Sequence, residues 1–107
     1  MDGFTLIDEQ NFDHEVLQSS LPILLEFGGE WCKPCKSLEP LLLKLEGEWG
    51  GRIRLAKLDV DECPNITMQH QVMSLPTLIL FVGGERRELM VGLQSADKIR
   101  AMVASYL

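Results

Sequence analysis

The sequence lacks an apolar run of even 18 residues, and a membrane-spanning helix needs about 20. Met1 to Thr5 contain no basic region followed by an apolar stretch, so no secretory signal peptide is recognisable. Positive charge is also scarce, since 10 Lys and Arg face 16 Asp and Glu and give a net charge of −6. Such a surface repels the phosphates of nucleic acids and of anionic membranes. We therefore expect neither a membrane segment nor a nucleic-acid partner.

Cysteine is scarce too, with three residues in the chain. Small secreted domains stapled by disulfides usually carry a larger, even number. The count favours a reducing compartment, the cytoplasm, where a cysteine pair cycles between dithiol and disulfide. A structural zinc ion wants four ligands. Only Cys63 and His70, with His14 as a spare, could join Cys32 and Cys35, so we expect no metal and no cofactor beyond a redox-active disulfide.

The length of 107 residues favours a single domain, residues 1–107. Hydrophobic periodicity predicts strands near 4–7, 21–27, 52–60, 78–82 and 87–91 and helices near 11–18, 34–49, 66–72 and 95–106. The order βαβαβαββα predicts an α/β fold, a three-layer α/β/α sandwich around a central mixed β-sheet. Its core is parallel, and a final hairpin through Gly83 and Gly84 adds an antiparallel edge.

Two cysteines lie three residues apart in the stretch from Glu30 to Lys36, between a buried strand and an amphipathic helix. Cys32 should lie at the strand-to-helix turn and Cys35 in the first helical turn. A pair at this spacing beside βαβ units indicates a dithiol/disulfide couple. The positive end of the helix, together with Lys33 and Lys36, favours a thiolate at Cys32. Cys32 would then form a mixed disulfide with a target, and the more buried Cys35 would resolve it.

Glu26 is the only charged residue in the apolar strand that precedes the cysteines. If Glu26 is buried, its pKa is raised, and it can take a proton from Cys35 near neutral pH. If it points out of the sheet, it is merely solvated. The sequence leaves both interpretations open.

The stretch Trp31-Cys32-Lys33-Pro34-Cys35-Lys36 resembles the active-site motif of the thioredoxin family, and the resemblance extends over the whole chain. Pro40 matches a proline that kinks the active-site helix, and Leu75-Pro76-Thr77 resembles the cis-proline turn. The remaining matches are Lys57, Asp59-Val60-Asp61, Gly84 and Gly92.

The resemblance implies the thioredoxin fold and a protein-disulfide reductase with Cys32 as nucleophile and Cys35 as resolving cysteine. It also implies a buried acid at Glu26 with Lys57, a buried lysine, as its partner. A cis Pro76 would face the cysteines, keep metals off them and expose the Leu75 backbone to a substrate strand. The substrate-binding residues would be Trp31, Lys33, Pro34, Leu75, Pro76 and Gly92. Expected partners are proteins with disulfides and an electron donor of the thioredoxin-reductase type, with the protein itself a monomer.

Three departures from the family pattern lead to further expectations. Lys33 replaces the usual Gly, and its charge should stabilise the thiolate and make the couple more oxidising. Glu26 replaces the usual Asp and resembles protein disulfide isomerase domains. Gly28 and Gly29 replace an aromatic and a small residue, which should loosen the active-site loop and put recognition by an ordinary reductase in question. The alternatives are a disulfide oxidase or isomerase, and a non-catalytic binding module with this fold.

Two residues outside the motif are expected to be bystanders. Cys63 follows Asp61 and Glu62 in a loop that we expect to be exposed, where negative charge should leave its thiol unreactive. His70 is expected on the surface of a short helix.

Overall fold

The computed structural model describes residues 3–107. Met1 and Asp2, which belong to the stretch assessed for a signal peptide, lie outside the described residues. The strands are β1 (Phe4–Ile7), β2 (Ile23–Gly28), β3 (Arg54–Asp59), β4 (Thr77–Val82) and β5 (Glu85–Val91). The helices are α1 (Lys33–Trp49), α2 (Pro64–Gln69) and α3 (Ala96–Val103), with a π-helical segment η1 (Asp13–Leu17) and a terminal 3₁₀ turn η2 (Ala104–Tyr106). The predicted order of elements is confirmed.

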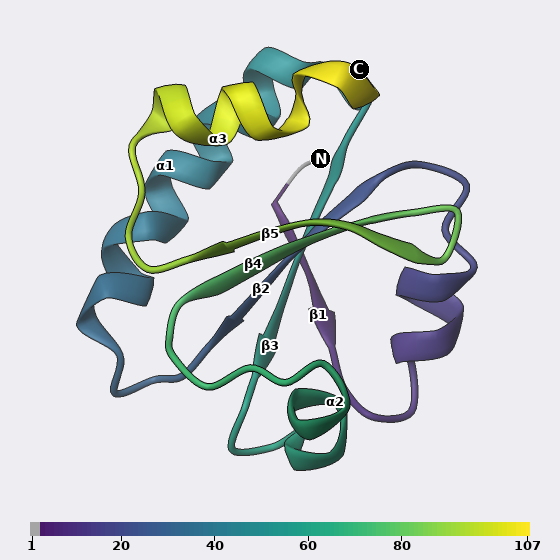
Figure 1. Cartoon of the computed structure of the whole chain (residues 1–107), viewed down its shortest axis with the longest axis vertical. Coiled ribbons are helices and arrows are strands. Elements are labelled where there is room, and N and C mark those ends of the chain that lie inside the picture. Colours follow the sequence, from purple (N-terminus) through teal and green to yellow (C-terminus); the bar gives the residue numbers. More distant parts are fainter. Residues whose placement is uncertain (1–2) are drawn as a thin grey trace.

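The five strands form one mixed sheet in the order β1-β3-β2-β4-β5 (Figure 1). β1, β3 and β2 run parallel, and β4 pairs antiparallel with both β2 and β5. β2 therefore lies at the centre, and all six of its residues are buried. Burial on both faces explains its nearly continuous apolar sequence. Gly83 and Gly84 adopt positive φ values of 60° and 84°, which close the predicted β4–β5 hairpin.

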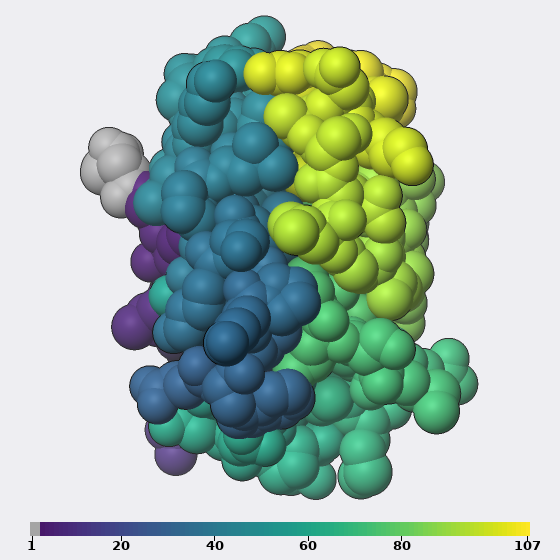
Figure 2. Space-filling model, turned by 90° about the vertical axis from the view of Figure 1, so that its left-hand side faces the viewer, coloured from purple at the N-terminus to yellow at the C-terminus, as the bar shows by residue number. Residues whose placement is uncertain are grey.

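Helices cover both faces of the sheet and give the predicted three layers (Figure 1). One core cluster joins the sheet to α1 and α3 and includes Leu24, Leu38, Leu42, Leu45, Trp49, Leu80, Ile99 and Val103. The other joins it to η1 and α2 and includes Phe12, Val16, Ile23, Phe27, Ile66 and Phe81. Figure 2 shows α1 and α3 packed against each other over one face. The apolar side of α1, from Leu38 to Trp49, is thus buried between the sheet and α3.

Element boundaries differ slightly from those that the sequence predicts. α2 begins at Pro64, because a proline loses no hydrogen bond in a first helical turn. It ends before Gln71, whose φ of 57° cannot continue a right-handed helix. Asp8 accepts hydrogen bonds from the backbone N–H groups of Gln10 and Asn11, both at 2.8 Å. This turn delays the first helical segment to Asp13. α1 runs through Pro40 to Trp49, as expected.

Cys63 does not lie in an exposed position, which corrects the expectation from its acidic neighbours. Its side chain is 1% exposed and its sulfur lies 3.8 Å from the carbonyl oxygen of Ile7. Asp61 and Glu62 face solvent while the apolar thiol turns into the core. Burial, followed by the charge of Glu9, raises the pKa of Cys63 to about 11. The thiol is thus held protonated, as predicted, but chiefly by desolvation.

The expectation that His70 lies on the surface is also wrong. It caps the end of α2, and its ring packs against those of Phe12, Phe27 and Phe81 at centroid distances of 5.6, 6.4 and 5.4 Å. Burial, followed by the charge of Arg86, lowers the pKa of His70. The half-buried imidazole is therefore part of the core on the α2 side.

Candidate active site

Cys32 and Cys35 lie at the start of α1, joined by a disulfide bond, with their Cα atoms 5.3 Å apart. Cys32 is the N-cap residue with extended backbone angles, and its sulfur accepts a hydrogen bond of 3.2 Å from the backbone N–H of Cys35. Pro34 occupies the first helical turn, where its missing N–H leaves no bond unmade. Cys32 is 4% exposed and Cys35 is 1% exposed. Cys35 is thus the more buried of the two cysteines, as predicted.

The turn from Ser74 to Thr77 lies beside the cysteine loop. The Leu75–Pro76 peptide bond is cis, as the resemblance implies. Since Phe27 pairs with Thr77 across β2 and β4, the register places Pro76 next to the residue that opens the cysteine loop. The backbone N–H of Gly92 donates to the Pro76 carbonyl at 2.7 Å, with a φ of 88° that favours glycine. This hydrogen bond from the residue that follows β5 fixes the position of the Pro76 carbonyl.

The indole of Trp31 folds back onto the cysteine loop instead of entering the core. Its side chain is 65% exposed, and its Nε1–H donates to Oδ2 of Asp61 at 2.8 Å. A Cβ at Gly29 would lie 3.0 Å from that nitrogen, so glycine leaves the room that the indole needs. Sequence reasoning missed this contact. The strand order could have predicted it, because β2 and β3 run parallel and the loops that follow them, which carry Trp31 and Asp61, lie at the same edge of the sheet.

Glu26 is buried in the centre of β2, so the interpretation that it is solvated is wrong. It is 1% exposed, and neither carboxylate oxygen accepts a hydrogen bond from a group within residues 3–107. Burial, followed by the negative charge of Glu39, raises the pKa of Glu26 to about 8, while Lys57 and Lys36 oppose the rise. The carboxyl group therefore holds a proton at neutral pH and can exchange it in the physiological range.

Gly28 separates the buried acid from the resolving cysteine. A Cβ at this position would lie 3.1 Å from Sγ of Cys35 and 3.5 Å from Oε2 of Glu26. The two groups thus flank one backbone position that has no side chain. A gap of this kind can be bridged by a water molecule that carries a proton between them.

Lys57 does not pair with Glu26, which corrects the expectation of a buried lysine beside the acid. Its Nζ lies 3.3 Å from Oε1 of Glu39 and 5.3 Å from the centre of the Phe4 ring. The lysine side chain is 38% exposed. Sequence reasoning missed Glu39, although it follows Cys35 by one helical turn and so faces the same side of α1.

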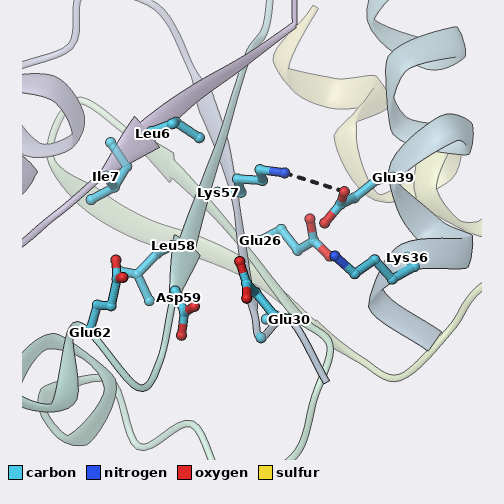
Figure 3. Close-up of a pocket in the computed structure, with 12 residues that line it drawn as sticks. Leu6, Ile7, Glu26, Glu30, Lys36, Glu39, Lys57, Leu58, Asp59 and Glu62 are labelled. Carbon is cyan, nitrogen blue, oxygen red and sulfur yellow. Dashed lines mark hydrogen bonds and ion pairs between the residues drawn. The ribbon is translucent and has the colours of Figure 1, made fainter. Parts of the chain in front are cut away.

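These side chains surround a pocket of about 250 Å³ between α1 and the edge formed by β1 and β3 (Figure 3). It is lined by Leu6, Ile7, Glu26, Gly28, Gly29, Glu30, Lys36, Glu39, Lys57, Leu58, Asp59 and Glu62. Within residues 3–107, no three His, Cys, Asp or Glu side chains are grouped so that they could hold a metal ion. None of the helices in that range is long and apolar enough to cross a membrane.

A disulfide at a helix N-terminus, beside a proline turn and a buried acid, defines a thiol–disulfide oxidoreductase on a mixed α/β sheet. Comparisons with known proteins agree, since the family model described as Thioredoxin matches residues 3–105. A thioredoxin of Acidithiobacillus ferridurans is 37% identical over 106 residues, which cover 99% of this chain and 98% of the relative. A thioredoxin of Rickettsia felis is 38% identical over 93 residues, which cover 87% of this chain and 89% of the relative. A thioredoxin of Synechocystis is 33% identical over 101 residues, which cover 94% of this chain and 94% of the relative.

The chain therefore belongs to the thioredoxin family. It has the thioredoxin fold and is a thioredoxin-type dithiol oxidoreductase, as the sequence predicts. Its redox group is the Cys32–Cys35 pair.

Proposed function

We propose that the protein, as one domain over residues 1–107, reduces disulfide bonds in other proteins. The observation that carries this proposal is the Cys32–Cys35 disulfide at the start of α1, with the Cys32 sulfur accepting the Cys35 N–H. In the reduced protein this N–H and the positive end of the helix stabilise a thiolate at Cys32. Exposed Lys33 and Lys36 add positive charge nearby.

The first step is attack of the Cys32 thiolate on a target disulfide. A bond forms between the Cys32 sulfur and one target sulfur, and the target's S–S bond breaks. The other target sulfur leaves as a thiolate and takes a proton from solvent. Cys32 and the target are then joined as a mixed disulfide.

The second step is resolution by Cys35. The Cys35 thiol gives its proton to the Glu26 carboxylate through the gap beside Gly28. The Cys35 thiolate attacks Cys32, forms the Cys32–Cys35 disulfide and releases the second target sulfur as a thiolate, which is protonated in turn. The protein has gained a disulfide, and the target has gained two thiols.

The substrate-binding surface consists of Trp31, Lys33, Pro34, Leu75, Pro76 and Gly92. The exposed indole of Trp31 and the half-buried Leu75 support this assignment, because an extended target segment can bind a free backbone turn through main-chain hydrogen bonds. No cofactor takes part besides the disulfide.

Turnover requires two electrons from outside the chain. A donor of the thioredoxin-reductase type would supply them to the Cys32–Cys35 disulfide. We assign the protein, as a monomer, to the cytoplasm, and the odd cysteine count with a buried Cys63 supports this reducing compartment. Lys33 would make the couple more oxidising than in relatives that carry glycine there.

Reduction of insulin by dithiothreitol, followed as turbidity, tests the proposal. We expect the wild-type protein to accelerate the reaction and Cys32→Ser to abolish the acceleration. Cys63→Ala serves as the matched control and should retain the activity. A wild-type protein that adds nothing to the rate with dithiothreitol alone contradicts the proposal and favours a binding module.

A further inference from the structure

The lysine nearest Glu26 in the sheet forms its ion pair with a different acid. Glu26 and Lys57 are direct neighbours in the β2–β3 register. The Lys57 ammonium nevertheless pairs with Glu39 on α1, at 3.3 Å. The strand pairing thus places a lysine next to Glu26, but the ammonium group of this lysine forms its ion pair with a residue of α1.

No other positively charged side chain within residues 3–107 takes the place of Lys57 as an ion-pair partner of Glu26. Within residues 3–107 no ammonium or guanidinium lies in ion-pair contact with it, and its two oxygens have no donor. The negative charge of nearby Glu39 adds repulsion to this unpaired carboxylate. Because an unpaired buried carboxylate is costly, the protonated form is favoured.

The charged groups around Glu26 come from α1, from β3 and from the loops that follow β2 and β3. Lys36 and Glu39 approach from α1 and Lys57 from β3, and all point toward the same space (Figure 3). Glu30, Asp59 and Glu62 line the rest of the pocket. Of the four surrounding acids, Glu39 is the one whose charge raises the pKa of Glu26.

We propose that Glu39 is a positioning residue for thiol–disulfide exchange: by holding the Lys57 ammonium, it leaves Glu26 without a counter-ion and keeps the proton on the Glu26 carboxyl. This inference rests on the proposed role of Glu26 as the acceptor of the Cys35 proton. Glu39 does not touch the sulfur atoms. It sets the pH range in which Glu26 can act.

The consequence for the reaction follows from the proton balance of the second step. Cys35 can lose its proton only to an ionised Glu26, and with a pKa of about 8 roughly a tenth of Glu26 is ionised at pH 7. The rate of resolution should therefore rise with pH up to about 8. Removing Glu39 frees Lys57 to pair with Glu26, which stabilises the carboxylate and moves this rise to lower pH.

Titration of the Glu26 carboxyl carbon by ¹³C NMR in the oxidised protein tests the inference without any turnover. In Glu39→Gln the midpoint should fall by about one pH unit, the size expected when an opposite charge replaces a like charge nearby. Glu39→Asp keeps the charge and should retain most of the wild-type midpoint. The matched control is Glu48→Gln, an acid of the same helix about 13 Å further along, paired with Arg100. Equal midpoints in Glu39→Gln and wild type overturn the inference.

A double-mutant cycle isolates the part played by Lys57. If release of Lys57 carries the effect, Glu39→Gln shifts the midpoint less in a Lys57→Met protein than in the wild type. Equal shifts in the two proteins would overturn the claim that Glu39 acts by holding Lys57.

Stopped-flow reaction of the reduced protein with 5,5′-dithiobis(2-nitrobenzoate) connects the titration to function. Attack by Cys32 releases the first thionitrobenzoate, and resolution by Cys35 releases the second. We expect Glu39→Gln to leave the first phase unchanged and to make the second roughly tenfold faster at pH 6, which corresponds to the one-unit shift. A wild-type protein without a second phase refutes the proposed function. A normal wild-type reaction with an unchanged second phase in Glu39→Gln refutes only the role of Glu39.

Discussion

Glu26→Gln should remove most of the pH dependence of stability between pH 4.5 and 8. Glu26 is buried without a donor to either oxygen, and its pKa rises from 4.5 to about 8 on folding. In this pH range the unfolded chain loses the proton while the folded protein keeps it. The contribution of a protonated Glu26 is thus complete below pH 4.5 and is lost as the pH rises to 8.

The size of this loss follows from the two pKa values. Each pH unit between 4.5 and 8 corresponds to about 1.4 kcal/mol, so the whole interval corresponds to about 5 kcal/mol. That is a large part of the roughly 5–15 kcal/mol that stabilises a domain. Glutamine has a similar shape and no charge to bury. Glu26→Gln should therefore be several kcal/mol more stable than wild type at pH 8.5 and close to it at pH 4.5.

Urea unfolding of the oxidised proteins at 25 °C, from pH 4.5 to 9, measures this difference. Exposed Glu30 lines the same pocket, and Glu30→Gln is the matched control that should follow the wild-type curve. Parallel curves for Glu26→Gln and wild type over the whole range would refute the argument, because Glu26 would then ionise alike in the folded and unfolded chains.

Two further substitutions examine the neighbours of the cysteines. Gly28→Ala would place a Cβ 3.1 Å from Sγ of Cys35, close the gap to Glu26 and slow release of the second thionitrobenzoate at least threefold, with the first phase unchanged. An unaltered second phase would show that no proton passes there. Lys33→Gly should lower the reduction potential and move titration of the Cys32 thiolate, followed by absorbance at 240 nm, to higher pH. If the thiolate titrates as in wild type, or if the wild-type potential already equals that of an ordinary thioredoxin or lies below it, the electrostatic role of Lys33 is wrong.

The layers of the fold could be predicted because they depend on periodicity along the chain. The apolar run of β2 requires burial on both faces, and the stripe of leucines in α1 requires one covered face. The glycine pair at 83 and 84 fixes the hairpin. Boundaries were less accurate, because Pro64 and the turn at Asp8 act through local hydrogen bonding that periodicity does not reveal.

The active site was predictable where neighbours in sequence are neighbours in space. The disulfide and the position of Cys35 inside α1 follow from the spacing of two residues around a strand-to-helix turn. The ion pair of Lys57 with Glu39 was not predictable in this way. The two residues are 18 positions apart in the sequence, and their contact depends on how α1 packs across β3. The burial of Cys63 and His70 likewise depends on packing between elements, and their polar neighbours in sequence gave a wrong indication.

The most direct test of the account is to trap the mixed disulfide with a protein substrate. In the proposed mechanism Cys32 attacks and Cys35 resolves, so Cys35→Ser should accumulate a complex with reduction-sensitive linkage to an oxidised substrate such as insulin. Peptide mapping should locate the link at Cys32. Cys32→Ser should trap nothing under the same conditions. A complex that forms through Cys35 in Cys32→Ser, but not through Cys32 in Cys35→Ser, would contradict the account.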